Sequence, residues 1–242
     1  MTGQLSILER DITACELCPR LRDWCREVAR VKRRAYLGQE YWGRPVPGFG
    51  DPHARLFILG LAPGAHGANR TGRVFTGDSS GDFLYGVLHR AGFANQPESQ
   101  HWGDGLQLKD AWVSAAVRCA PPANKPTPRE VETCRPFLER EFALFSRTSV
   151  CVALGKLAFD NWLAILRSRG LIGSRAAFTF GHGTEFEIPG SPHLISSYHP
   201  SRQNTQTGRL TEEMLLQVFL RARALIDSAS PATSKTRDRD KR

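Results

Sequence analysis

Four short apolar runs punctuate the chain and predict the strands of a buried sheet. They are Arg55 to Leu61, Ala111 to Val117, Ser149 to Gly155 and His193 to Tyr198. Continuous apolar character over this length is typical of parallel strands covered on both faces. Stretches with helical spacing lie between these runs and after the last one. They are near Gly81 to Ala91, Pro128 to Phe145, Lys156 to Arg169 and Leu210 to Ile226. The alternation predicts an α/β fold built on a parallel sheet.

The remaining segments complete one predicted domain over residues 1–227. Apolar spacing from Ser6 to Arg34 predicts helices, broken near Cys15 to Pro19, where Pro19 opens a new helix at its first turn. Tyr36 to Pro52 is rich in Trp, Pro and Gly and predicts an ordered loop. Alternating Phe residues in Ala176 to Ile188, around a Gly-His-Gly, predict a hairpin. Residues 228–242 have almost nothing to bury and predict a disordered basic tail.

Charge is the one unusual feature of the composition. The chain has 33 Lys and Arg against 24 Asp and Glu, a formal net charge of +9. A surplus of this sign favours a polyanionic partner, although solubility alone is the simpler explanation. No apolar run reaches the ~18 residues of a membrane span, and the N-terminus lacks a signal-peptide pattern, so we expect a cytosolic chain.

Six cysteines in a reducing compartment indicate metal ligands, catalytic groups or core residues rather than disulfides. Cys15 and Cys18 form a C-x2-C pair, and Cys119 and Cys134 flank a proline-rich loop that is stiff enough to hold a preformed ligand set. Four thiolates suit either an iron-sulfur cluster or structural zinc. The two others, in a predicted helix and a predicted strand, are expected to be core residues: Cys25 and Cys151.

Polar candidates follow the first and last apolar runs. Phe75 and Asp78 end the glycine-rich segment after the first run, whose spacing matches neither a P-loop nor a dinucleotide fingerprint. His199 stands where the last strand leaves the core, and it opens a segment rich in Ser, Arg, Gln and Asn. Such side chains bond phosphates and base edges, although a solvated loop before a helix capped by Thr207 or Thr211 explains the segment equally well. Both candidates are expected at the ligand-binding edge of the sheet.

Four strings found together carry a resemblance to a known family. They are Gly-Leu-Ala-Pro-Gly-Ala-His-Gly, Phe-Thr-Gly-Asp, Cys-Ala-Pro-Pro-x-Asn-Lys-Pro and His-Pro-Ser-Arg-Gln-Asn-Thr-Gln-Thr-Gly-Arg. From about Ile12 to Phe219 the chain resembles the uracil-DNA glycosylase superfamily, and within it the bacterial and archaeal family five. The resemblance implies a three-layer α/β/α sandwich with a central four-stranded parallel sheet. It also implies a [4Fe-4S] cluster on Cys15, Cys18, Cys119 and Cys134, which decides against zinc.

The implied activity is hydrolysis of the N-glycosidic bond of a deaminated base flipped out of DNA, leaving an abasic site. The implied catalytic residues are Asp78, His199, Asn124 and Asn204. The resemblance implies that the base is contacted by Phe75, Gly60, Ala62, Gly64 and Ala65. It implies that the DNA is contacted by Ser201, Arg202, Gln203, Thr207 and Arg209. Asp78 orients water and stabilises a cationic sugar, while His199 donates to the leaving base. The partners expected are double-stranded DNA containing uracil or other deaminated bases and, further, single-stranded DNA. We expect the protein to act as a monomer and to bind no membrane.

Two departures from other families bear on the substrate. Gly64-Ala65 stands where relatives place a polar residue after the loop proline, and Ser114-Ala115 stands where family four has Thr-Asn. Family five shows both changes, and its association with hypoxanthine and xanthine implies a range beyond uracil. Two other classes stay open: a non-catalytic iron-sulfur protein that binds nucleic acid, and a zinc-stabilised small-molecule hydrolase. Asp78 argues against the first and the +9 charge against the second.

Overall fold

The computed structural model describes residues 2–229, which fold around one six-stranded sheet of order β1-β3-β2-β4-β6-β5. The four central strands are parallel and match the four predicted runs: β2 (Leu56–Gly60), β3 (Ala111–Ala115), β4 (Val150–Leu154) and β6 (His193–Ser197). The predicted count of four is wrong, because two short antiparallel strands extend the edges. These are β1 (Phe49–Gly50), beside β3, and β5 (Glu185–Phe186), beside β6.

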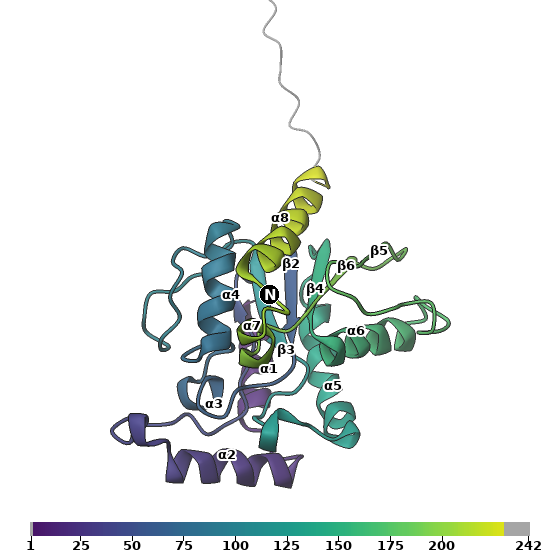
Figure 1. Cartoon of the computed structure of the whole chain (residues 1–242). Helices are drawn as coiled ribbons and strands as arrows, with labels where there is room; N and C mark the ends of the chain where they lie inside the picture. The colour runs from purple at the N-terminus through teal and green to yellow at the C-terminus, as the bar shows by residue number, and fades with distance from the viewer. Residues whose placement is uncertain (1, 230–242) are drawn as a thin grey trace, which may run out of the picture.

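Helices cover both faces of the sheet and confirm the three-layer sandwich (Figure 1). One face packs against α4 (Ser79–Arg90) and α8 (Glu212–Ser228), and the other against α1 (Thr2–Thr13), α5 (Pro128–Ala143) and α6 (Lys156–Ser168). Within β2, Leu56 and Ile58 belong to the first layer and Phe57 and Leu59 to the second. Both sets are fully buried, which explains why the strand reads as an unbroken apolar run.

Short helices frame the carboxyl end of the sheet. The predicted N-terminal pair is confirmed: α1 ends at Thr13, and α2 (Pro19–Val31) starts with the proline at its first position. After β2 comes α3 (Ala68–Thr71), and after β6 comes α7 (Arg202–Gln206), a helix that the sequence did not predict. In Figure 1, α7 lies in front of the lower part of the strands, and α3 lies below it and to its left. Two single turns, η1 (Arg34–Tyr36) and η2 (Pro122–Asn124), complete the description.

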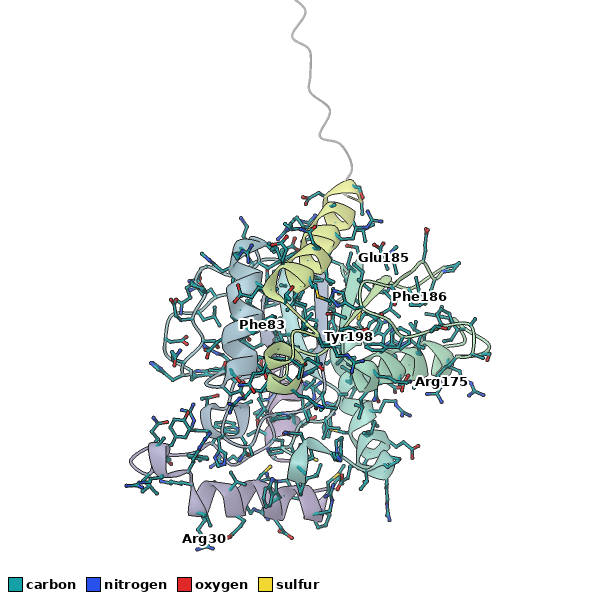
Figure 2. All side chains as sticks on the ribbon, viewed as in Figure 1. Arg30, Phe83, Arg175, Glu185, Phe186 and Tyr198 are labelled. Atoms are coloured by element: carbon teal, nitrogen blue, oxygen red, sulfur yellow. The ribbon has the colours of Figure 1, made fainter. Side chains whose placement is uncertain are left out.

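The hairpin predicted within residues 176–188 is wrong. Only Glu185 and Phe186 form a strand there, and they pair with Ile195 and Leu194 of β6 at the outer edge of the sheet (Figure 2). Phe178 stacks edge-on against Phe186 with ring centroids 5.3 Å apart, so the alternating aromatics cover an apolar cluster instead of pairing across a turn. The predicted basic tail lies outside the described residues, apart from Ser228, the last residue of α8, and its cap Ala229. Within residues 2–229, every helix is too short or too polar to span a bilayer.

Candidate active site

A cavity of about 630 Å³ opens at the carboxyl end of the sheet. Its walls are the segments that follow β2, β3 and β6, as expected for an open parallel sheet. The predicted residues that line it are Ala62, Gly64, Ala65, Phe75, Asp78, Asn124, His199, Ser201, Arg202 and Gln203. Four predicted residues lie outside the lining: Gly60, Asn204, Thr207 and Arg209.

Asp78 is held in one orientation as the N-cap of α4. Its Oδ1 accepts the backbone N–H groups of Ser80 and Gly81 at 3.0 and 3.1 Å. Its Oδ2 lies against the loop after β2, so close that a Cβ added to Gly64 would stand 2.6 Å from it and one added to Gly67 1.8 Å. Glycine at these two positions is therefore required by the approach of the carboxylate, which turns one oxygen toward the loop that lines the cavity.

Burial moves the pKa of both titratable groups that the sequence singled out. Desolvation raises the pKa of Asp78, and the backbone hydrogen bonds from Gly81 and Ser80 partly oppose that shift. Desolvation lowers the pKa of His199 to about 4, so its imidazole is neutral at pH 7. The cavity thus pairs a carboxylate with a neutral imidazole.

The rings of Phe75 and His199 lie side by side, with centroids 5.7 Å apart and planes at 30°. Phe75 has a φ of +50°, a conformation that non-glycine residues rarely adopt. A Cβ added to Gly60 would lie 2.7 Å from the Phe75 ring, so this glycine makes room for the aromatic instead of lining the cavity. The Asn204 amide donates to the His199 carbonyl at 2.8 Å, which makes it a positioning residue for that segment.

Asn124 projects from a tight turn that the cysteine loop supports. Asn124 and the preceding Ala123 both have positive φ, 56° and 52°, and the turn is exposed. Arg20 of α2 anchors the turn: it donates to the Lys125 carbonyl at 3.2 Å and pairs with Glu130 at 2.8 Å. Two successive left-handed residues store strain that surrounding contacts must maintain, which is a common feature of functional loops.

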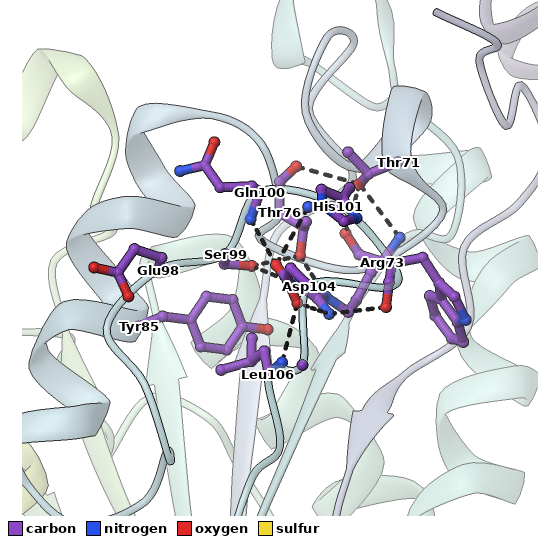
Figure 3. Close-up of polar contacts among 12 residues, drawn as sticks. Thr71, Arg73, Thr76, Tyr85, Glu98, Ser99, Gln100, His101, Asp104 and Leu106 are labelled. Carbon is purple, nitrogen blue, oxygen red and sulfur yellow. Dashed lines mark hydrogen bonds and ion pairs between the residues drawn. The ribbon is translucent and has the colours of Figure 1, made fainter.

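A buried network fixes the segment that carries Phe75 and Asp78 (Figure 3). The Arg73 guanidinium pairs with Asp104 at 2.6 Å and also donates to Thr76 Oγ1 at 2.9 Å and Ser99 Oγ at 3.0 Å. Hydrogen bonds from Arg73 and from backbone N–H groups hold the pKa of Asp104 well below its usual range. Residues 73–76 are thereby tied to residues 99–104. No local pattern along the chain indicates this long-range pairing.

Comparison with known proteins decides the family. Residues 47–223 match the model described as "Uracil DNA glycosylase superfamily". The chain is 54% identical over 214 residues to a type-5 uracil-DNA glycosylase of Thermus thermophilus, covering 88% of this chain and 94% of that protein. It is 51% identical over 224 residues to the type-5 uracil-DNA glycosylase of Mycobacterium leprae, with 92% and 96% covered. A type-5 relative from Pyrobaculum aerophilum is 43% identical over 210 residues, with 87% and 88% covered.

The chain belongs to the type-5 branch of the uracil-DNA glycosylase superfamily. The resemblance inferred from four short strings is therefore confirmed over most of the chain.

In this type-5 glycosylase chain the polar segment after β6 divides into two parts. Ser201 opens α7, and the exposed Arg202 and Gln203 reach the rim of the cavity. Farther on, the Thr207 hydroxyl donates to the Gln203 carbonyl at 2.6 Å, and the Arg209 guanidinium lies 4.6 Å from the Tyr198 ring. The first part faces the cavity, whereas the second shapes α7 and the neighbouring surface. Thr211, one of the two predicted caps, is the N-cap of α8.

The four predicted cysteine ligands line one small cavity between α2 and α5: Cys15, Cys18, Cys119 and Cys134. As they are placed, no three His, Cys, Asp or Glu side chains within residues 2–229 could hold a metal ion. Desolvation raises the pKa of Cys134 to about 11. The atoms that this cavity offers to a metal group are the four cysteine sulfurs. Cys25 in α2 and Cys151 in β4 are fully buried, which confirms them as core residues.

The site includes residues that the sequence reasoning missed. His66 lines the cavity from the first loop, and its Nδ1 lies 3.0 Å from the Tyr41 hydroxyl. Ser79, Ser80 and Lys125 also line it. Each stands within a few residues of a predicted site residue, so proximity along the chain was the available signal.

Proposed function

We propose that this protein removes uracil from DNA by hydrolysing the N-glycosidic bond, leaving an abasic site. The observation that carries the proposal is the fixed carboxylate of Asp78 facing the same cavity as the neutral imidazole of His199. The type-5 uracil-DNA glycosylases that the chain resembles support the same reaction.

Cleavage of the bond between C1′ and the base nitrogen separates charge. The sugar becomes cationic and the leaving base anionic, so a useful site offers a carboxylate to one and a hydrogen-bond donor to the other. In our proposal Asp78 orients the attacking water and stabilises the sugar, and neutral His199 donates to the departing base oxygen. The base stacks on Phe75, Asn124 bonds its edge or the water, and the backbone of residues 62–65 completes the pocket.

A base within a duplex cannot enter the cavity until it is flipped, at a cost of a few kcal/mol. Arg202 and Gln203, exposed at the cavity rim, are placed to fill the vacated position in the stack. Phosphate contacts by a chain of net charge +9 offset part of the flipping cost. We further propose that the protein acts as a monomer on the DNA of the nucleoid, in the cytoplasm.

A duplex with a single uracil tests the proposed function. The labelled uracil strand should stay intact after incubation with the protein and break at the uracil position when alkali is added. A thymine duplex of the same sequence is the control. A duplex that is bound and never becomes alkali-labile would instead favour the non-catalytic nucleic-acid-binding protein.

We also propose that the substrate range extends to hypoxanthine and xanthine. The cavity wall at the end of β3 is the methyl group of Ala115, while the neighbouring Ser114 hydroxyl is buried and bonded to Glu141. That wall therefore offers no side-chain amide that would select the uracil edge. Base release measured on matched uracil, hypoxanthine, xanthine and thymine duplexes checks this range, and release of uracil alone would contradict it.

We propose that Cys15, Cys18, Cys119 and Cys134 hold a [4Fe-4S] cluster, supported by four sulfurs lining one cavity. When bound, the cluster would cross-link the loops that it joins, and it need not take part in redox chemistry. The Cys119–Cys134 loop carries Asn124, so its tether positions a cavity residue.

Purified protein should therefore be brown and contain about four iron and four sulfide per chain. Cys119→Ala should lose the colour and lower the thermal stability, because an unligated loop loses its tether. Cys151→Ala, a buried cysteine outside the ligand set, is the control for iron content. Colourless wild-type protein with stoichiometric zinc would overturn this assignment.

The single-turnover rate should rise with pH along one acidic limb and then stay level through neutrality. Asp78 must be ionised, and its raised pKa places the limb above the usual range of an aspartate. The pKa of His199, about 4, means that this residue is already neutral below pH 6. A rate that falls as pH rises through about 6.5, the ordinary histidine pKa, would show that a protonated imidazole is needed instead.

A further inference from the structure

A groove of about 1000 Å³ lies outside the candidate active site, between α1 and α2. The segment 41–47 and Trp102 close its other sides. We call it the α1–α2 groove. Its side chains combine aromatic rings with arginines, and the proposed base-excision site does not use them: Arg10, Arg22, Arg26, Trp42, Arg44 and Trp102.

The two tryptophans of the α1–α2 groove are exposed yet held in place. Trp102 is 60% exposed and Trp42 36% exposed, the first packing edge-on against Phe49 at 6.2 Å. The Trp42 indole N–H donates to the Pro45 carbonyl at 3.1 Å, and the Arg44 guanidinium lies 5.6 Å from the Trp42 ring. Fixed aromatic faces beside arginine are the surfaces on which unpaired bases stack.

The charge of the α1–α2 groove favours a polyanion, because four arginines line it against two glutamates, Glu9 and Glu16. Glu16 pairs with Arg26 at 2.6 Å and lies 3.4 Å from Arg22, so these arginines are partly neutralised. Among residues 2–229, neither Arg10 nor Arg44 has an acidic partner within ion-pair distance. Two guanidinium groups without an acidic partner at the walls of an aromatic groove suit a nucleic-acid backbone better than an apolar peptide.

The α1–α2 groove adjoins the base cavity. Tyr41 lines the groove and His66 lines the cavity, and the Tyr41 hydroxyl lies 3.0 Å from His66 Nδ1. The Trp42 backbone N–H also donates to the Arg70 carbonyl at 2.9 Å, which attaches the groove wall to α3. A strand bound at the cavity therefore has the groove as its neighbour.

We propose that the α1–α2 groove binds single-stranded DNA, with unpaired bases stacked on Trp42 and Trp102 and phosphates on Arg10 and Arg44. The inference rests on the proposed function for its choice of DNA, although the binding itself requires no base release. The α1–α2 groove would thus be a second binding site for the DNA strand, next to the damaged base.

Binding of a fluorescent oligothymidylate of about 16 nucleotides tests the proposal, because it contains no substrate base. Trp102→Ala should raise its Kd about tenfold, the loss of roughly one stacked base. Arg10→Ala combined with Arg44→Ala should raise the Kd and reduce the slope of log K against log salt by about 1.4, two contacts at ~0.7 each. Leu220→Ala and Arg167→Ala, exposed on α8 and α6, are the matched controls and should change neither quantity.

Removal of the Trp102 side chain should spare the fold, since the contact with Arg73 uses the Trp102 carbonyl. The proposal would be overturned if both groove variants bound oligothymidylate with unchanged affinity. It would also be overturned if the groove bound a protein partner and no oligonucleotide. Uracil release from duplex DNA, measured on the same preparations, separates the two hypotheses. Normal oligonucleotide binding without base release would refute the proposed function alone, whereas normal release with groove-independent binding would refute this inference alone.

Discussion

Asp78→Asn should lower the single-turnover rate of uracil release by about two to four orders of magnitude, the effect of removing a charge-stabilising group from a buried site. The carboxylate is the negative charge that the proposed mechanism sets against the cationic sugar. Duplex affinity should survive or rise slightly, because a carboxylate near DNA phosphates is repulsive before the bond breaks.

Asparagine is the right substitution because the fold also uses Asp78. Its Oδ1 caps α4 through Ser80 and Gly81, and an asparagine oxygen caps a helix as well as an aspartate oxygen. Asp82→Asn is the matched control: it neutralises a carboxylate one turn along α4 that does not line the base cavity, and should leave the rate within about tenfold. Near-native rates for Asp78→Asn would contradict this role and move the orientation of water to Asn124, which also lines the cavity.

Glu141→Ala should destabilise the protein by about 3–5 kcal/mol, the usual effect of leaving a buried charge without its partner. The Arg118–Glu141 pair, 2.6 Å apart, has side chains only 2% and 1% exposed. The Ser114 hydroxyl donates to the same carboxylate, and the Arg118 backbone N–H donates to Cys134 Sγ at 3.3 Å. Loss of Glu141 therefore affects both the end of β3 and the cysteine loop.

Urea unfolding of Glu141→Ala and Arg140→Ala compares the loss of a buried ion pair with the loss of a surface ion pair at adjacent positions of α5. Arg140 pairs with Asp11 on the surface, with side chains about half exposed, so its loss should change the free energy of unfolding by less than about 1 kcal/mol. Equal effects of the two substitutions would show that the buried pair adds no more to stability than the surface pair.

The core of the fold could be predicted because parallel strands buried on both faces leave a local signal. The run from Leu56 to Leu59 is apolar without alternation, and β2 lies at the centre of the sheet between β3 and β4. Strands β1 and β5 left no such signal, since two residues at an edge are too few to form a pattern. In residues 176–188, the alternation of Phe178 and Phe180 arose from packing on an aromatic cluster, which has the same period as a strand.

The site was predictable where a polar residue stands in the segment that leaves the carboxyl end of a strand. Asp78 and His199 come from segments that leave β2 and β6 at one sheet edge, and the structure places both at one cavity. Contacts across long sequence separations were not predictable. The pairing of Arg73 with Asp104 and the bond from Asn204 to the His199 carbonyl depend on tertiary packing, which no local spacing encodes.

The released product tests the central claim most directly. Wild-type protein incubated with a single-uracil duplex should yield free uracil, identified by mass spectrometry, together with an unbroken strand that is cleaved only when alkali is added. Free uracil should be stoichiometric with the alkali-labile strand. Stable binding of the duplex with no free uracil, or strand scission without alkali, would contradict hydrolysis of the glycosidic bond by this site.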